Sequence, residues 1–252
     1  MKRLALVLVV FLLSFISVSA QEWVGIDNVS PTKTQKYLVS SSEEEIVVDL
    51  KVAGFLQEKV MTPNGEQYVI SGDDMAPILE AGSPDLPLYS IPIIIGDKAE
   101  MKVSVLKSKY VDFENIEVAP SKGNFSRKIN PDDVPYIYGD MYQEDAFYPA
   151  QQADLEKPYI IRDYRAQNLM VYPYAYNPVT KTLRVYTELT FSVKKVGDNG
   201  INQKVSSRRS NVITSEFDAS YKRRFINYEN DSRGFIVDEG EMLIVCADDY
   251  MQ

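Results

Sequence analysis

The 252-residue sequence predicts an all-β fold, an antiparallel β-sandwich of jelly-roll type over residues 21–196. Apolar residues in this region recur at every second position of short runs, which is typical of strands with one buried face. Turns that contain Gly and Pro separate these runs, a pattern that favours an antiparallel sandwich or barrel. About 180 residues are ample for one hydrophobic core of this kind.

The first twenty residues have the features of a secretory signal peptide. Two basic residues follow Met1, residues 4–16 are almost entirely apolar, and small residues precede Gln21. This arrangement predicts cleavage between Ala20 and Gln21, with export through the periplasm to the cell surface or the medium. The apolar stretch is shorter than the roughly 20 residues that a membrane span needs, so we expect no stable membrane span.

The sandwich region contains several separate strand signals. The clearest lie at residues 46–52, 91–95, 101–105 and 183–193. In the last run one apolar face is expected to consist of Leu183, Val185, Leu189, Phe191 and Val193. Residues 177–180 (NPVT) form a turn motif before it, and residues 168–176 are expected to supply its antiparallel partner.

Residues 197–233 are expected to be a linker that contains one helix. The stretch up to residue 213 is polar, and Ser215 with Asp218 then resembles the capping box that opens a helix. Four aromatic residues fall on one stripe of this helix: Phe217, Tyr221, Phe225 and Tyr228. The basic residues on the opposite face are interpreted as solvated.

The last nineteen residues differ in character from the sandwich. Residues 242–247 (MLIVCA) form a continuous apolar run, typical of a strand that is buried on both faces of a parallel sheet. Such a strand needs neighbouring strands and crossover helices, which do not follow in the sequence given. Residues 234–252 are therefore expected to be the start of a second domain, of α/β type.

Charge and composition exclude several classes of function. Without the signal peptide the chain has 25 Lys and Arg against 36 Asp and Glu, a net charge of −11, which argues against nucleic acid and anionic membranes as partners. The sequence has a single cysteine, Cys246, and no histidine. A Ser–His or Cys–His pair and a Cys/His zinc site therefore lack their side chains. We expect no catalytic residue, metal or cofactor in this chain.

Residues 119–135 predict a long surface loop, because three prolines and one glycine interrupt any regular structure. Long loops of this kind are commonly functional or disordered. Aromatic residues follow between positions 136 and 148, which indicates an ordered base. Arg127 and Lys128 lie near the tip, and the residues alone are most simply interpreted as solvated loop charge.

A second basic position lies in the polar stretch 229–234. Arg233 precedes Gly234 there, and an exposed, unstructured basic residue is a preferred cleavage site for an Arg-specific peptidase. The motif alone is weak, since arginine is common in linkers.

Several stretches together resemble the pre-pro region of the gingipains, secreted cysteine peptidases that cleave after Arg or Lys. These stretches are residues 82–87 (GSPDLP), 119–139, 145–149 (DAFYP), 177–188 and 240–250. The resemblance extends from about residue 81 to the end of the sequence. Residues 119–149 are its most specific part, because the block is long and unusual in composition.

The resemblance implies an inhibitory and folding-assisting propeptide that covers the active site of a caspase-like peptidase downstream in the same parent chain. Arg127 matches the basic loop residue that occupies the P1 pocket in this family, and Lys128 would take that role if the peptidase prefers lysine. A processing peptidase would release the propeptide at Arg233–Gly234. Cys246 matches no catalytic position, so the fragment itself should have no peptidase activity.

Two other interpretations stay open on the sequence. The first is a secreted β-sandwich module that binds carbohydrate or a surface protein and has no link to proteolysis, for which 17 tyrosines would be suitable contacts. The second is a purely structural segment of the cell surface.

Overall fold

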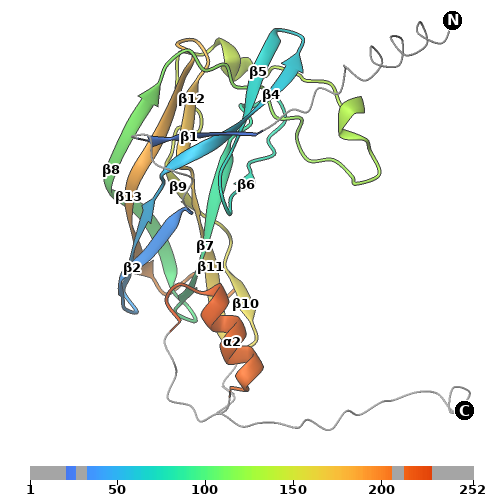
Figure 1. The fold of residues 1–252 in the computed structure, drawn as a ribbon. Helices are drawn as coiled ribbons and strands as arrows, with labels where there is room; N and C mark the ends of the chain where they lie inside the picture. Colours follow the sequence, from blue (N-terminus) through green and yellow to red (C-terminus); the bar gives the residue numbers. More distant parts are fainter. Residues whose placement is uncertain (1–20, 27–32, 206–212, 229–252) are drawn as a thin grey trace, which may run out of the picture.

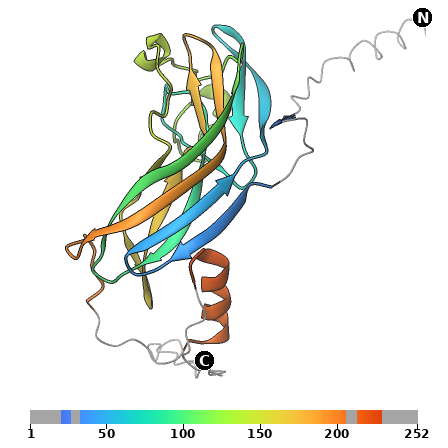
Figure 2. The ribbon, with the colours of Figure 1, turned by 90° about the vertical axis from the view of Figure 1, so that its left-hand side faces the viewer.

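The computed structural model describes residues 21–26, 33–205 and 213–228. Two five-stranded sheets and one three-stranded sheet, all with antiparallel ladders, form an elongated sandwich, which confirms the predicted all-β class (Figures 1 and 2). Gln21 is exposed at the start of this region. Ala20, the Arg233–Gly234 junction and the apolar run 242–247 lie outside the described residues.

The first layer of the sandwich is built around the long strand β13. Its strands are β2 (Gln35–Ser41), β3 (Glu45–Lys51), β8 (Glu100–Phe113), β12 (Tyr174–Asn177) and β13 (Thr182–Gly197). β13 pairs with β8 along almost its whole length, and with β12 and then β3 on its other side. The strands predicted at 101–105 and 183–193 are confirmed as parts of β8 and β13, and the strand predicted at 46–52 is confirmed as β3, which ends one residue earlier.

The second layer contains the strand predicted at 91–95. Its strands are β6 (Ala76–Pro77), β7 (Pro87–Ile95), β9 (Ala153–Leu155), β10 (Tyr159–Ile161) and β11 (Tyr164–Val171). The smaller sheet consists of β1 (Glu22–Gly25), β4 (Gly54–Thr62) and β5 (Gly65–Ser71). Two short 3₁₀ helices, η2 (Pro131–Asp133) and η3 (Asp140–Gln143), interrupt the long connection between β8 and β9.

The prediction that residues 168–176 form one strand beside β13 is wrong in its first part. Residues up to Val171 belong to β11 in the second layer, and only β12 pairs with β13. The chain changes layers at Tyr172–Pro173. Pro173 cannot donate a ladder hydrogen bond, and its carbonyl instead accepts one from the Tyr186 N–H at 2.9 Å.

The hydrophobic core lies between the two five-stranded layers. The inward face of β3 is almost fully buried, with Ile46, Val48 and Leu50 at 2%, 0% and 1% exposure. The predicted apolar face of β13 is confirmed as part of the same core: Leu183, Val185, Leu189, Phe191 and Val193. The opposing side chains come from β7 and β11: Tyr89, Ile91, Ile93, Ile95, Leu169 and Val171. Burial of each of these side chains stabilises the fold by about 1.5–3 kcal/mol.

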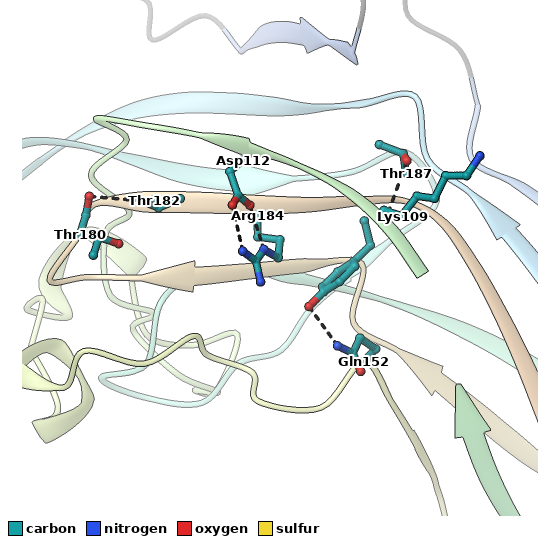
Figure 3. Close-up of polar contacts among 8 residues, drawn as sticks. Lys109, Asp112, Gln152, Thr180, Thr182, Arg184 and Thr187 are labelled. Carbon is teal, nitrogen blue, oxygen red and sulfur yellow. Dashed lines mark hydrogen bonds and ion pairs between the residues drawn. The ribbon is translucent and has the colours of Figure 1, made fainter. Parts of the chain in front are cut away.

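An arginine on β13 fastens the edge strand β8 to the first layer. Arg184 donates two hydrogen bonds to the carboxylate of Asp112, at 2.8 and 2.9 Å (Figure 3). Its guanidinium also stacks 3.8 Å from the ring of Tyr110 and 4.2 Å from that of Phe147. Because the carboxylate favours the charged form, the pKa of Arg184 is raised.

The predicted helix is confirmed as α2 (Ser215–Arg224), which lies beside β10 and β11 of the second layer (Figure 1). Three residues of the predicted aromatic stripe pack there: Tyr221 on α2, and Phe225 and Tyr228 just after its end. The fourth, Phe217, is exposed. Tyr221 and Phe225 are 1% and 3% exposed. The expected capping box does not form. Thr214 is the N-cap residue and makes no side-chain cap bond, while the Asp218 carboxylate turns to Lys222 and to the Tyr228 hydroxyl. No helix in the described ranges is long and apolar enough to cross a membrane.

A buried arginine on β11 holds the segment that follows β13. The Arg165 side chain is 0% exposed, and its guanidinium donates to the carbonyls of Gly96, Ala99, Ile201 and Asn202 at 2.8–3.0 Å. Each of these acceptors is a backbone group of a turn or loop. The described part of the stretch predicted as a polar linker, residues 197–205, is therefore held against the sandwich.

The chain after α2 covers the free edge of β7. The Ile226 N–H donates to the Pro92 carbonyl at 3.2 Å. The Asn227 amide then accepts from the Ile94 N–H at 2.8 Å and donates to the Ile94 carbonyl at 2.9 Å. An uncovered strand edge is a template for unwanted pairing, so this contact protects the sheet as well as fixing the exit of the chain.

Candidate functional site

The loop that carries Arg127 and Lys128 protrudes from the end of the sandwich opposite α2, as both views show (Figures 1 and 2). β7 connects the two ends. Pro87, at its start, lies beside the loop residues, and Ile94, near its end, bonds Asn227. Seven residues of extended chain separate these ends by about 24 Å.

The start of the loop is fixed by backbone hydrogen bonds on two sides. On one side Tyr68 of β5 exchanges bonds with Glu117 and Ala119, both at 2.8 Å. On the other side the Asp85 N–H donates to the Ala119 carbonyl at 2.9 Å, and the Ser121 N–H to the Ser83 carbonyl at 2.7 Å. Residues 117–121 thus run as an added strand between the small sheet and the GSPDLP segment.

Glycines allow the two ends of the loop to approach the same segment. Gly82 accepts a hydrogen bond from the Gly139 N–H at 2.9 Å, and a Cβ on Gly139 would lie 3.0 Å from the Gly82 carbonyl oxygen. Gly123 has a φ of +81°, and a Cβ there would lie 2.8 Å from that of Ala81. Gly82 and Gly123 need glycine because their backbone is left-handed, with φ of +82° and +81°, whereas at Gly139 the close approach to Gly82 is the reason.

Three tyrosines anchor the returning half of the loop. The Tyr142 hydroxyl donates to the Val118 carbonyl at 3.0 Å, and the Tyr148 hydroxyl to the Glu80 carboxylate at 2.6 Å. Tyr138 bonds the Thr62 hydroxyl at 2.9 Å and also the side chain of Gln67. The aromatic residues after position 135 therefore form the ordered base that the sequence predicts.

The interior of the loop is braced by one lysine. The Lys122 ammonium donates to the Pro131 carbonyl at 2.8 Å and lies 4.4 Å from the centre of the Tyr136 ring. The Asn130 side chain accepts from the Asp132 N–H at 3.2 Å and caps η2. The two limbs of the loop are thereby joined a few residues below its tip.

The tip itself presents the two predicted basic residues to solvent. A turn closes between Ser126 and Ile129 through a 2.9 Å backbone hydrogen bond, and Arg127 and Lys128 occupy its two central positions. Both are exposed. In the described part of the chain no ion pair involves either side chain, so both charges are available to a partner.

A cavity lies between this loop and the sandwich, and the sequence did not reveal it. Its volume is about 330 Å³. Its walls are mainly apolar and are formed by Val69, Ile70, Met75, Pro77, Leu79, Pro87 and Phe125. Asp85 supplies the one carboxylate of the lining, and Lys122 and Tyr136 its other ionisable groups. Burial raises the pKa of Asp85 from 3.8 to about 6.

The raised pKa of Asp85 predicts a fold that loses stability as the pH rises from about 4 to about 6. The folded state holds the proton over this range while the unfolded chain releases it, so ionisation favours unfolding. Relative to Asp85→Asn, the wild type should lose up to about 3 kcal/mol of unfolding free energy between these pH values. Urea unfolding of both proteins across the range measures the difference.

Glu188 has a lowered pKa, so its effect on stability changes with pH in the opposite direction to that of Asp85. Hydrogen bonds from Lys107 and Lys109 lower the pKa of Glu188 to about 2. Any stability that these two contacts give is lost only as the pH falls towards this value. A constant stability difference between wild type and Asp85→Asn from pH 4 to 6 would contradict the assignment to Asp85.

The fold and the loop define an all-β domain that presents a braced basic segment at one end of a sandwich. The sequence matches the Propeptide_C25 family over residues 31–236. The chain belongs to this family, the propeptides of the gingipains.

Relatives and solved structures agree with this assignment. Gingipain R1 of Porphyromonas gingivalis is 36% identical over 217 residues, which are 84% of this chain and 21% of the relative. Gingipain R2 of the same species is 36% identical over 219 residues, 86% of this chain and 29% of the relative. The chain therefore spans less than a third of the length of these relatives.

Two solved structures share the fold. A complex of the pro- and mature domains of RgpB from Porphyromonas gingivalis contains a chain that matches with a TM-score of 0.69 and 36% identity, over 77% of this chain and 98% of that one. A structure of gingipain K from Porphyromonas gingivalis, solved to explain its zymogenic latency, matches with a TM-score of 0.60 and 20% identity. The match covers 71% of this chain and 100% of that one. At that identity the second match supports the fold alone.

Proposed function

We propose that this chain is the inhibitory and folding-assisting propeptide of a secreted gingipain-like cysteine endopeptidase, and that Arg127 blocks the active site of that peptidase. The observation that carries the proposal is the exposed Arg127 at the tip of a loop whose two limbs are both fixed to the sandwich. A relative supports the proposal, because the solved RgpB structure is a complex of a prodomain with a mature domain.

The braced loop suits inhibition for two physical reasons. A guanidinium presents a rigid fork of N–H donors that a pocket carboxylate holds with two hydrogen bonds. A loop that is already ordered loses little conformational entropy on binding, so more of the interaction energy appears as affinity. Ordering also resists the distortion that a scissile bond undergoes in the transition state, so the loop binds without being cleaved rapidly.

Release of the propeptide is assigned to cleavage between Arg233 and Gly234, by a processing peptidase. Asn227 fixes the exit of the chain at the end of β7 that lies away from the loop. A peptidase domain that begins at Gly234 and holds Arg127 in its active site would therefore extend along the sandwich between its two ends. The Ala20–Gln21 signal cleavage would precede this step during export.

The experiment uses residues 21–252 and a mature gingipain R-type peptidase. The purified chain should hydrolyse no Arg- or Lys-terminated amide substrate and should inhibit the peptidase at a molar ratio near one. Hydrolysis by the chain alone would contradict the proposal. Absence of inhibition, together with binding to glycans or a surface protein, would instead favour the β-sandwich binding module.

A further inference from the structure

The cavity behind the inhibitory loop has the chemistry of a binding site. Its volume of about 330 Å³ is at the lower end of the range for small-molecule sites, and its lining combines apolar walls with few polar groups. Asp85 comes from the GSPDLP segment, whose backbone fixes the loop, but the inhibitory function gives no role to the Asp85 carboxylate. The site lies apart from Arg127 at the loop tip.

The carboxylate of Asp85 has no counter-ion in the described residues. The basic side chain of the lining, Lys122, instead donates to the Pro131 carbonyl and lies over the Tyr136 ring. An ionised carboxylate among apolar walls is unfavourable unless a cation pairs with it. A group that brings one positive charge on an apolar body would satisfy the carboxylate and fill the cavity together.

We propose that this cavity binds an organic monocation, an ammonium, amidinium or guanidinium group on an apolar stem, with Asp85 as its counter-ion. The stem contacts the aliphatic wall of β5 and β7 on one side and Phe125 on the other. Phe125 lies two residues before Arg127, so the occupant braces the inhibitory loop from beneath. This last consequence rests on the proposed function, whereas binding itself does not.

Two sources can supply such a group. One is a free small amine or amidine, and the other is a Lys or Arg side chain of the peptidase that the loop inhibits. The chemistry of recognition is the same for both, and the experiment below separates them.

The test uses benzamidine as the probe, benzamide as its neutral isostere, and NMR spectra of residues 21–252. Benzamidine should bind saturably and shift resonances of Phe125 and Tyr136, while benzamide should bind at least about tenfold more weakly. Asp85→Asn should abolish the difference between the two probes. Glu114→Gln, at an exposed acid outside the cavity, is the matched control and should behave as wild type.

The pH dependence gives a second readout. The Asp85 carboxyl changes its charge between about pH 5 and about pH 7.5, whereas burial raises the pKa of Tyr136, so that this phenol stays neutral over the same range. Because the pKa of Asp85 is about 6, the affinity for benzamidine should be about tenfold lower at pH 5 than at pH 7.5. Saturable benzamidine binding that is unchanged in Asp85→Asn, or no binding at all, would overturn the proposal.

Complex formation then identifies the source. If a peptidase side chain occupies the cavity, Asp85→Asn should weaken the complex with the mature peptidase although Arg127 is intact. If the natural occupant is a free cation, that affinity should be unchanged while benzamidine binding is lost. Failure to inhibit the peptidase at all would count against the proposed function and leave the benzamidine result standing.

Discussion

Arg127→Ala is expected to raise the inhibition constant against a gingipain R-type peptidase by about 30- to 1,000-fold, which corresponds to 2–4 kcal/mol. The side chain would be a central anchor that is desolvated in a pocket, and truncation leaves the pocket carboxylate unpaired. Inhibition kinetics with a chromogenic Arg-terminated substrate measure the change. Because Arg127 makes no ion pair in the described part of the chain, the variant should unfold at the same temperature as wild type.

Lys128→Ala is the matched control, since Lys128 is the neighbouring exposed residue of the same turn. It should change the inhibition constant by less than about fivefold if the peptidase prefers arginine. Arg127→Lys should recover only part of the inhibition, because an ammonium cannot make the bidentate contact. If Lys128→Ala has the large effect and Arg127→Ala the small one, the P1 mimic is Lys128 and the assignment to Arg127 is wrong.

Arg165→Met is expected to destabilise the fold by about 3–5 kcal/mol. The variant keeps much of the side-chain volume but removes the guanidinium bonds to four backbone carbonyls, of which that of Gly96 keeps a second donor, the Ala99 N–H. The loss of free energy of unfolding can be measured in urea. Arg223→Met, at an exposed position of α2, should stay within about 0.5 kcal/mol of wild type.

Hydrogen exchange locates the effect of Arg165 within the fold. The Gly200 N–H donates to the Lys98 carbonyl at 3.0 Å, and the Lys204 N–H to the Asp97 carbonyl at 2.9 Å. These amides should lose protection first, because Arg165 holds both segments together. Arg165→Lys, which keeps the charge but fewer donors, should show a smaller loss if Arg165→Met does not fold. Unchanged protection at these amides would contradict the role of Arg165.

The strands were predictable where burial follows a strict alternation along one segment. β3 and β13 have this pattern, so their inward faces were assigned correctly from the sequence. The change of layer at Pro173 was not predictable, because residues 168–176 are compatible with a strand in either sheet. The sheet that each part of this segment joins depends on distant partners such as β7, which lies about eighty residues earlier in the sequence.

The candidate site was predictable in its exposed part only. Prolines and a glycine marked the loop, and the resemblance to the gingipains singled out Arg127 at its tip. The cavity was missed because its walls come from residues 69–87 and 121–136, which no local pattern connects. The role of Arg165 was missed for a similar reason, since its acceptors are backbone carbonyls and leave no signature in the sequence.

The most direct test of the account is the rate at which an arginyl chloromethyl ketone alkylates the catalytic cysteine of the mature peptidase while this chain is bound. If the sandwich covers the active site through Arg127, the wild-type chain should suppress alkylation, and Arg127→Ala at a concentration that still forms the complex should restore it. Full-rate alkylation of a peptidase that is saturated with wild-type chain would contradict the account.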